Sequence, residues 1–101
     1  MSYKNHPMIG KKIVLRGKTS GVYIGTVVSV AKYGTELKDS QRVWSWSGDA
    51  LDTFALAQTG PKTAKLSPVV QQSVVIRDAR EHMAMSDEAI LRFEEIGPWR
   101  G

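Results

Sequence analysis

The amino-acid sequence predicts an α+β fold: a small, curled antiparallel sheet, close in shape to an SH3-like barrel, with one or two short covering helices. Stretches rich in β-branched residues, separated by short turn signals, occupy the first half of the chain. The second half contains two stretches with helix-start and helix-stop residues. A chain of 101 residues has the size of one domain. We therefore assign residues 1–101 to a single domain, with 1–8 and 98–101 as flexible or interface tails.

Three or four strands joined by short loops are expected in the first half, as an antiparallel meander. The expected strands are 9–17, 22–32, 35–41 and 42–46. A period of two divides the second of these strands between two faces, with Val22, Ile24, Thr26, Val28 and Val30 on one and Tyr23, Gly25, Val27 and Ser29 on the other. The glycine at 25 indicates a bulge or a close approach of another backbone.

Two helices are expected in the second half. Oxygen-bearing residues at 47–49 precede the stretch 50–58, and Gly60-Pro61 ends it. Ser86 precedes 87–96, which has acidic residues in its first turn and Gly97-Pro98 at its end. The first helix has the apolar residues Leu51, Phe54 and Leu56. In the second helix, Ile90, Leu91 and Phe93 are expected to face the core.

Two further segments lie between these helices. Residues 61–68 contain two prolines and two lysines, and we expect them to form a loop. Residues 73–85 begin with β-branched residues and continue with polar alternation, which predicts a strand broken near Asp78.

Positive charge is concentrated at the start of the chain. The net charge is +4, yet residues 1–38 contain seven basic residues and one acidic residue, giving +6, while residues 39–101 sum to −2. This asymmetry favours an anionic partner for the N-terminal half. The alternative is that the lysines promote solubility by protecting strand edges from aggregation.

The chain lacks the residues that several classes of function require. The chain has no cysteine, so disulfides and thiolate metal sites are excluded, and a reducing compartment is expected. Residues 16–21 resemble a phosphate loop, but Lys12 stands where the first glycine of that motif belongs, and a strand rather than a helix is expected to follow. We therefore interpret this stretch as a turn. His6 and His82 are far apart and lack ligand spacing or an acidic partner. We predict a protein without enzymatic activity, cofactor or metal.

No apolar run is long enough to cross a bilayer and no signal-peptide pattern is present, so no membrane partner is expected.

The stretch 42–46, RVWSW, is the strongest candidate for a binding surface. In a strand, Arg42, Trp44 and Trp46 share one face. That face is either core, since tryptophan is highly buried on average, or a platform for nucleobases beside phosphate-binding cations. An intermediate arrangement packs Trp44 at the centre of the strand and leaves Trp46 partly exposed near its end. The candidate ligand-binding residues are Trp44, Trp46, Arg42, Arg16, Lys11, Lys12, Lys18 and Tyr23.

The stretches SYKNHPMIGKKIVLR, GVYIGTVVS, RVWSW, AKLS and SDEAI together resemble a family of small bacteriophage-encoded proteins of unknown function, over nearly the whole chain. Members commonly have an aromatic residue between the two tryptophans, where this chain has Ser45. The resemblance implies a phage accessory protein acting in the cytoplasm of the bacterial host. It brings no established catalytic residues.

These observations lead to one principal functional hypothesis and two alternatives. The first is a phage protein that binds an anionic nucleotide, as a counter-defence protein sequestering a nucleotide immune signal. A homo-oligomer is expected, because a symmetric interface readily forms a pocket that a chain of this size lacks. The alternatives are a DNA- or RNA-binding module, whose affinity would fall steeply with salt, and a protein-binding inhibitor of a host factor.

Overall fold

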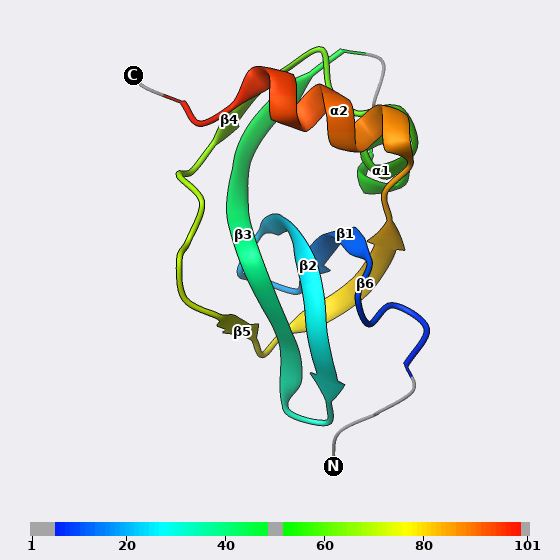
Figure 1. The fold of residues 1–101 in the computed structure, drawn as a ribbon, viewed down its shortest axis with the longest axis vertical. Coiled ribbons are helices and arrows are strands. Elements are labelled where there is room, and N and C mark those ends of the chain that lie inside the picture. The colour runs from blue at the N-terminus through cyan, green and yellow to red at the C-terminus, as the bar shows by residue number, and fades with distance from the viewer. Residues whose placement is uncertain (1–5, 49–51, 100–101) are drawn as a thin grey trace.

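The computed structural model describes residues 6–48 and 52–99, which form six strands and two helices (Figure 1). The strands are β1 (Lys12–Gly17), β2 (Val22–Ala31), β3 (Gly34–Ser47), β4 (Thr63–Leu66), β5 (Val74–Ile76) and β6 (Ala79–Ala84). The helices are α1 (Thr53–Thr59) and α2 (Asp87–Ile96). The expected α+β fold of a small barrel-like sheet with two short helices is confirmed.

The sheet is antiparallel and curls on itself. Its strand order is β4-β3-β2-β1-β6, and β5 pairs with the first part of β3. Although β3 and β6 are separated by two strands in this order, the Thr35 hydroxyl on β3 lies 2.7 Å from Nε2 of His82 on β6. This contact crosses the inside of the curl. Figure 1 shows the long β2–β3 hairpin forming the wall of the curl, with both helices at one end.

Bulges interrupt the regular alternation of the two longest strands. Gly25 on β2 lies opposite two residues of β3, Asp39 and Ser40, and Asp39 has a φ of 50°. A Cβ at position 25 would lie 3.1 Å from the Ser40 Cβ, so the expected bulge and close approach at this glycine are confirmed. A second bulge leaves Val28 unpaired, and Val30 therefore lies with Tyr23 and Val27. The predicted strict division of faces is wrong beyond Thr26.

The hydrophobic core consists of two clusters on opposite faces of the sheet. One fills the space between the sheet and the two helices and is made of Val14, Ile24, Val43, Leu56, Ala57, Leu66, Met83, Met85, Ala89 and Phe93. The other lies inside the curl and is made of Ile13, Leu15, Tyr23, Val27, Val30, Leu37 and Ile76. β1 and β2 contribute alternate residues to both clusters, so these strands are buried on both faces.

Both helices have the expected stops, but the first begins at a different cap. Asp52 is the N-cap of α1, and its carboxylate accepts a hydrogen bond from the Ala55 amide. The cap predicted at 47–49 is therefore wrong for its described positions, and Asp49 and Leu51 lie outside the described residues. Gly60 ends α1 with a φ of 76°, and Ser86 and Gly97 cap α2 as predicted.

The helix faces are only partly as expected. Phe93 is buried and Ile90 packs partly buried against the core, as predicted, and Leu56 of α1 is also buried. Phe54 and Leu91 are each 56% exposed, so the predicted place of Leu91 in the core is wrong. Each of these two helices covers the sheet with one narrow stripe, and these residues lie outside it.

The segments between the helices also differ in part from the prediction. The predicted loop at 61–68 contains β4, which pairs with the end of β3. The predicted break near Asp78 is confirmed, because β5 ends at Ile76 and β6 begins at Ala79. The two halves pair with different strands, β5 with β3 and β6 with β1, so the chain turns from one wall of the curl to the other at Arg77 and Asp78.

Candidate functional site

The loop between β1 and β2, residues 17–21, is folded around a carboxylate of the same chain. Asp78 accepts hydrogen bonds from the Thr19 and Ser20 amides and from both of their hydroxyls, at 2.5–3.0 Å. These donors lower the pKa of Asp78 far below its ordinary value of 3.8, with the Ser20 hydroxyl as the largest cause. The anion held by this glycine-rich loop is thus the protein's own side chain, which fits the expectation that the loop is a turn.

Neighbouring residues fix the same loop from two sides. A Cβ on Gly17 would lie 2.1 Å from the Ser20 hydroxyl oxygen and 2.9 Å from Oδ1 of Asp78, so only glycine fits without breaking these bonds. The Tyr23 hydroxyl donates to the Ser20 carbonyl at 3.1 Å. The Lys18 amide donates to the Asp78 carbonyl at 2.8 Å, which fixes the backbone from which the Lys18 side chain extends.

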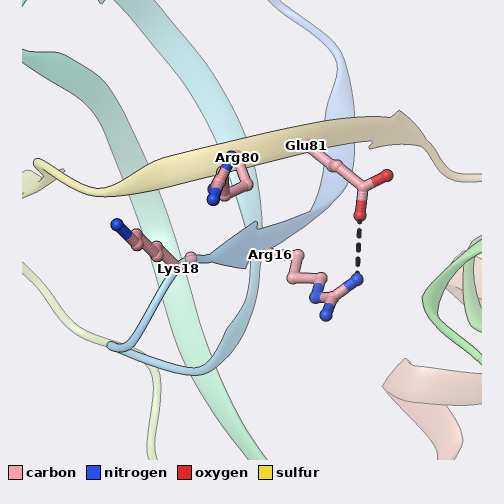
Figure 2. A pocket seen from close by; sticks show the side chains of 5 residues that line it. Arg16, Lys18, Arg80 and Glu81 are labelled. Carbon is pink, nitrogen blue, oxygen red and sulfur yellow. Dashed lines mark hydrogen bonds and ion pairs between the residues drawn. The ribbon is translucent and has the colours of Figure 1, made fainter.

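A shallow hollow of about 340 Å³ lies beside this loop, and we call it the basic hollow. It is lined by Arg16, Gly17, Lys18, Arg80 and Glu81. Figure 2 shows Lys18 and Arg80 extending to one side of the β1–β6 pair, while Arg16 extends to the other, toward Glu81. The hollow therefore has Lys18 and Arg80 on one side and the pair Arg16 and Glu81 on the other, at the ends of two paired strands.

The pairing of β1 with β6 explains why Arg80 belongs to this hollow. Arg16 lies opposite Glu81 and Gly17 lies opposite Ala79, so Arg80 is the extra residue of a bulge. A bulge redirects the side chain of its extra residue away from the regular alternation. Arg16 forms an ion pair with Glu81 at 3.4 Å between Nη1 and Oε1. Within the described residues, the charged ends of Lys18 and Arg80 form no ion pair or hydrogen bond.

A second hollow, of about 300 Å³, adjoins the first, and we call it the tryptophan hollow. It is lined by Arg16, Val22, Trp46, Asp52 and Thr53. Trp46 is half-buried and packs against the cluster beneath the helices. Because Arg16 lines both hollows, an aromatic side wall lies next to the cationic surface.

The structure distributes the two tryptophans of RVWSW differently from the prediction. A bulge in β3 between Val43 and Ser45 places Trp46 on the side of Val43, toward the helices, rather than on the face of Arg42. Trp44 is 52% exposed, and its ring meets the edge of Trp99 at 6.2 Å between ring centroids. The more buried tryptophan is thus Trp46, the reverse of the expected intermediate arrangement.

The other candidate residues lie elsewhere. Arg42 lies 5.0 Å from the centroid of the Tyr23 ring and donates to the Tyr23 hydroxyl. Tyr23 is buried in the inner cluster, so this pair supports the sheet and the 17–21 loop. Lys12 begins β1 and Lys11 directly precedes it, whereas Arg16 lies near the other end of the strand. Of the predicted cations, the structure brings together only Arg16 and Lys18.

Sequence reasoning missed Arg80 and Asp78. Both lie some 60 residues from the loop that they join, within a stretch of ordinary polar alternation. The break predicted near Asp78 was the one signal that this segment is special. Asp78 holds the loop and Arg80 adds the third cation, and neither role can be read without the β1–β6 register.

The two histidines, far apart in sequence, meet in the structure. The rings of His6 and His82 lie 5.7 Å apart between centroids in an edge-to-face arrangement. Burial lowers the pKa of His82 from its ordinary value, and the charge of His6 lowers it further. No group of three or more His, Asp or Glu side chains within 6–48 and 52–99 is placed to hold a metal ion.

Replacing Asp78 with asparagine is expected to lower the melting temperature by several degrees at neutral pH, because one acceptor oxygen becomes a donor. Since the pKa of Asp78 is lowered on folding, its stabilisation is complete above the ordinary value of 3.8 and declines as the pH falls below it. The difference between wild type and Asp78→Asn should be constant from pH 7 to about 5 and shrink toward pH 3. Thermal unfolding followed by circular dichroism measures it.

The exposed carboxylate of Asp39 offers the control. Asparagine tolerates the positive φ of this residue, so Asp39→Asn should change the melting temperature little at any pH. A difference for Asp78→Asn that grows as the pH falls would contradict the assigned role of its carboxylate.

The model of a family described as "Domain of unknown function (DUF6948)" matches residues 10–93, a range that includes every residue lining the basic hollow and the tryptophan hollow. No curated protein and no solved structure matches the chain. Among the described helices, neither is long and apolar enough to cross a membrane.

Proposed function

The chain belongs to the family described as "Domain of unknown function (DUF6948)", and we propose that it binds a nucleotide, with phosphate in the basic hollow and the base against Trp46. The observation that carries this proposal is the position of Arg16, which lines both the basic hollow and the tryptophan hollow. A ligand held there would touch cations at one end and an indole ring at the other. Nucleotides combine these two chemical features.

The charges of the basic hollow favour phosphate. Lys18 and Arg80 have no ionic partner among the described residues, so an incoming anion would displace no protein carboxylate from them. Arg16 would exchange or share its exposed contact with Glu81, which costs little because surface ion pairs are weak. The planar guanidinium groups of Arg16 and Arg80 suit bidentate contacts to phosphate oxygens.

The walls around Trp46 favour a flat ligand group. Val22 supplies an apolar contact, while Asp52 and Thr53 supply polar atoms at the start of α1. Stacking of a base on an aromatic side chain contributes about 1–3 kcal/mol. Trp46 is held by its packing against the core cluster, so little side-chain freedom is lost when a base binds.

A fluorescence titration tests the proposal. The variant Trp44→Phe with Trp99→Phe leaves Trp46 as the single tryptophan, and ATP, AMP and adenosine serve as probes. ATP should quench Trp46 with saturation, AMP should bind more weakly, and adenosine weakest of all. Lys18→Ala and Arg80→Ala should each weaken ATP binding by about 10- to 150-fold, as expected for loss of one charged hydrogen-bonding group.

A second basic hollow provides the matched control. Lys62 and Arg92 line a depression of about 520 Å³ with Glu88, Gly48, Thr59 and Gly60, and among the described residues no aromatic side chain lines it. Lys62→Ala and Arg92→Ala remove the same charges as the two test variants and should leave ATP binding unchanged. Equal losses for both pairs, or no quenching of Trp46 by any probe in the folded protein, would refute the proposal.

The biological setting that we propose follows from the resemblance to small phage-encoded proteins. The chain would act in a bacterial host as a counter-defence protein that sequesters a nucleotide signal, without enzymatic activity. Sequestration requires tight binding and no catalysis. A small fold whose site combines cations with a stacking surface is suited to that task. A homo-oligomer would deepen the open hollows, and sedimentation with and without ATP measures that association.

A further inference from the structure

A third hollow continues the row beyond Trp46, and we call it the edge hollow. It measures about 320 Å³, and its lining includes Trp46, Trp99, Lys65, Ser45 and Thr63. Trp46 therefore lines both the tryptophan hollow and the edge hollow, as Arg16 lines both the basic hollow and the tryptophan hollow. Through these shared lining residues, the three hollows follow one another in a path from Arg80 and Lys18, past Trp46, to Trp99.

Trp99 at the far end of this path is held in place by its surroundings. Its amide donates a hydrogen bond to the Leu66 carbonyl at 2.9 Å, which fixes Trp99 beside β4. Its ring meets the Trp44 ring at 84° between their planes, and the Lys65 ammonium lies 4.9 Å from its centroid. Half of the residue, 49%, stays exposed. A fixed, half-exposed indole beside a cation has the features of a stacking platform.

From this path we infer that the ligand carries at least two bases joined through phosphate, with the first base at Trp46 and the second at Trp99. The inference rests on the proposed nucleotide binding and extends it. A mononucleotide fills the basic and tryptophan hollows and leaves the edge hollow empty. A second base reaches Trp99, and the phosphate between the bases lies within the field of Lys65. The chemistry is shared by cyclic dinucleotides and by single-stranded nucleic acid.

Two variants with a single tryptophan separate the subsites. Trp46 alone remains in Trp44→Phe/Trp99→Phe, and Trp99 alone remains in Trp44→Phe/Trp46→Phe. The probes are AMP, the linear dinucleotide ApA, cyclic di-AMP and the single strand (dA)8. AMP should quench only Trp46, while at least one of the other three probes should quench both tryptophans. Trp99→Ala should weaken the binding of that probe by about 5- to 150-fold, the range for one stacked base, and change the affinity for AMP less than twofold.

If AMP binds at Trp46 but Trp99→Ala does not change the affinity for the two-base probes, the inference is overturned. The proposed function then stays intact. If no probe changes the fluorescence of either tryptophan, both the inference and the proposed function are overturned. Melting temperatures of all variants confirm that a loss of binding is not a loss of folding. Two outcomes support the inference and identify the source of the ligand. Preference for cyclic di-AMP with shallow salt dependence indicates a signalling dinucleotide, whereas preference for (dA)8 with affinity falling steeply with salt indicates nucleic acid.

Discussion

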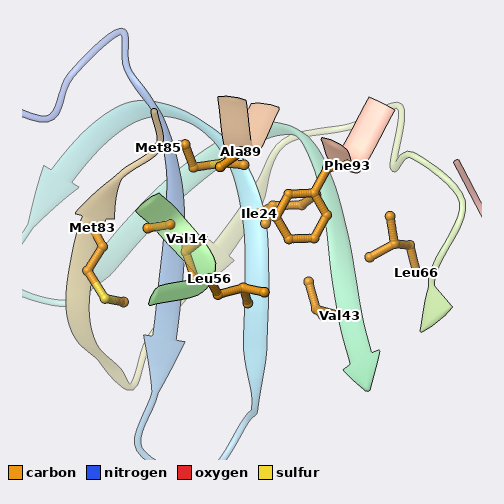
Figure 3. Close-up of a cluster of buried hydrophobic side chains, with 10 residues drawn as sticks. Val14, Ile24, Val43, Leu56, Leu66, Met83, Met85, Ala89 and Phe93 are labelled. Atoms are coloured by element: carbon orange, nitrogen blue, oxygen red, sulfur yellow. The ribbon is translucent and has the colours of Figure 1, made fainter. Parts of the chain in front are cut away.

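Replacing Phe93 with alanine is expected to lower the free energy of unfolding by about 3–5 kcal/mol, the usual cost of removing a buried phenyl ring. Phe93 is 2% exposed and projects from α2 into the cluster between the helices and the sheet. Figure 3 shows its ring beside Ile24 and above Val43, with Leu66 on its other side. Small domains have a total stability of about 5–15 kcal/mol, so the variant should be close to unfolding at 37 °C.

Urea denaturation followed by circular dichroism measures this loss. Leu91 lies on the same helix two residues earlier but is 56% exposed, so Leu91→Ala should change the unfolding free energy by less than about 0.5 kcal/mol. A similar small effect at Phe93 would mean that α2 is not anchored to the sheet by this ring. The comparison therefore tests the orientation of the helix as well as the depth of the core.

Features set by neighbouring residues were predicted well. Ser86 as a cap and Gly97 as a stop define α2 because both act within one turn of the helix. Gly25 indicated its own bulge, since a glycine inside a strand typically marks a bulge or a close backbone contact. By contrast, the sequence placed Leu91 in the core, because the apolar pattern of a short helix does not settle how far its buried stripe extends.

Features that depend on pairing between distant strands were not predictable. The bulge between Val43 and Ser45 arises where β3 meets β4, and it moves Trp46 to the side of Val43. A shift of one residue in a strand exchanges its two faces, so the strict alternation expected for RVWSW fails at Trp46. The site was not predictable for the same reason, because the basic hollow depends on strand pairing. The register of β1 against β6 brings Arg80 close to Lys18.

Reversing both unpaired charges of the basic hollow, in Lys18→Glu/Arg80→Glu, is expected to weaken ATP binding by at least about 100-fold, equivalent to about 2.7 kcal/mol. Two attractive contacts to phosphate become repulsive ones beside Glu81, which already lines the hollow. Stability should change little, because within the described residues neither charged end takes part in an ion pair or hydrogen bond. Titration of Trp46 fluorescence at moderate salt measures the affinity, and thermal unfolding confirms the fold.

The control for this reversal must change net charge equally. Lys32→Glu/Lys38→Glu alters two exposed lysines of the β2–β3 hairpin and brings the net charge from +4 to 0, as the test variant does. Long-range attraction acts on both variants, and salt screens it within about 10 Å at 0.1 M ionic strength. Direct contacts to phosphate are lost only in Lys18→Glu/Arg80→Glu. Equal losses in both variants would show that binding follows net charge alone, whereas a loss confined to Lys18 and Arg80 places the phosphate beside the loop that Asp78 holds.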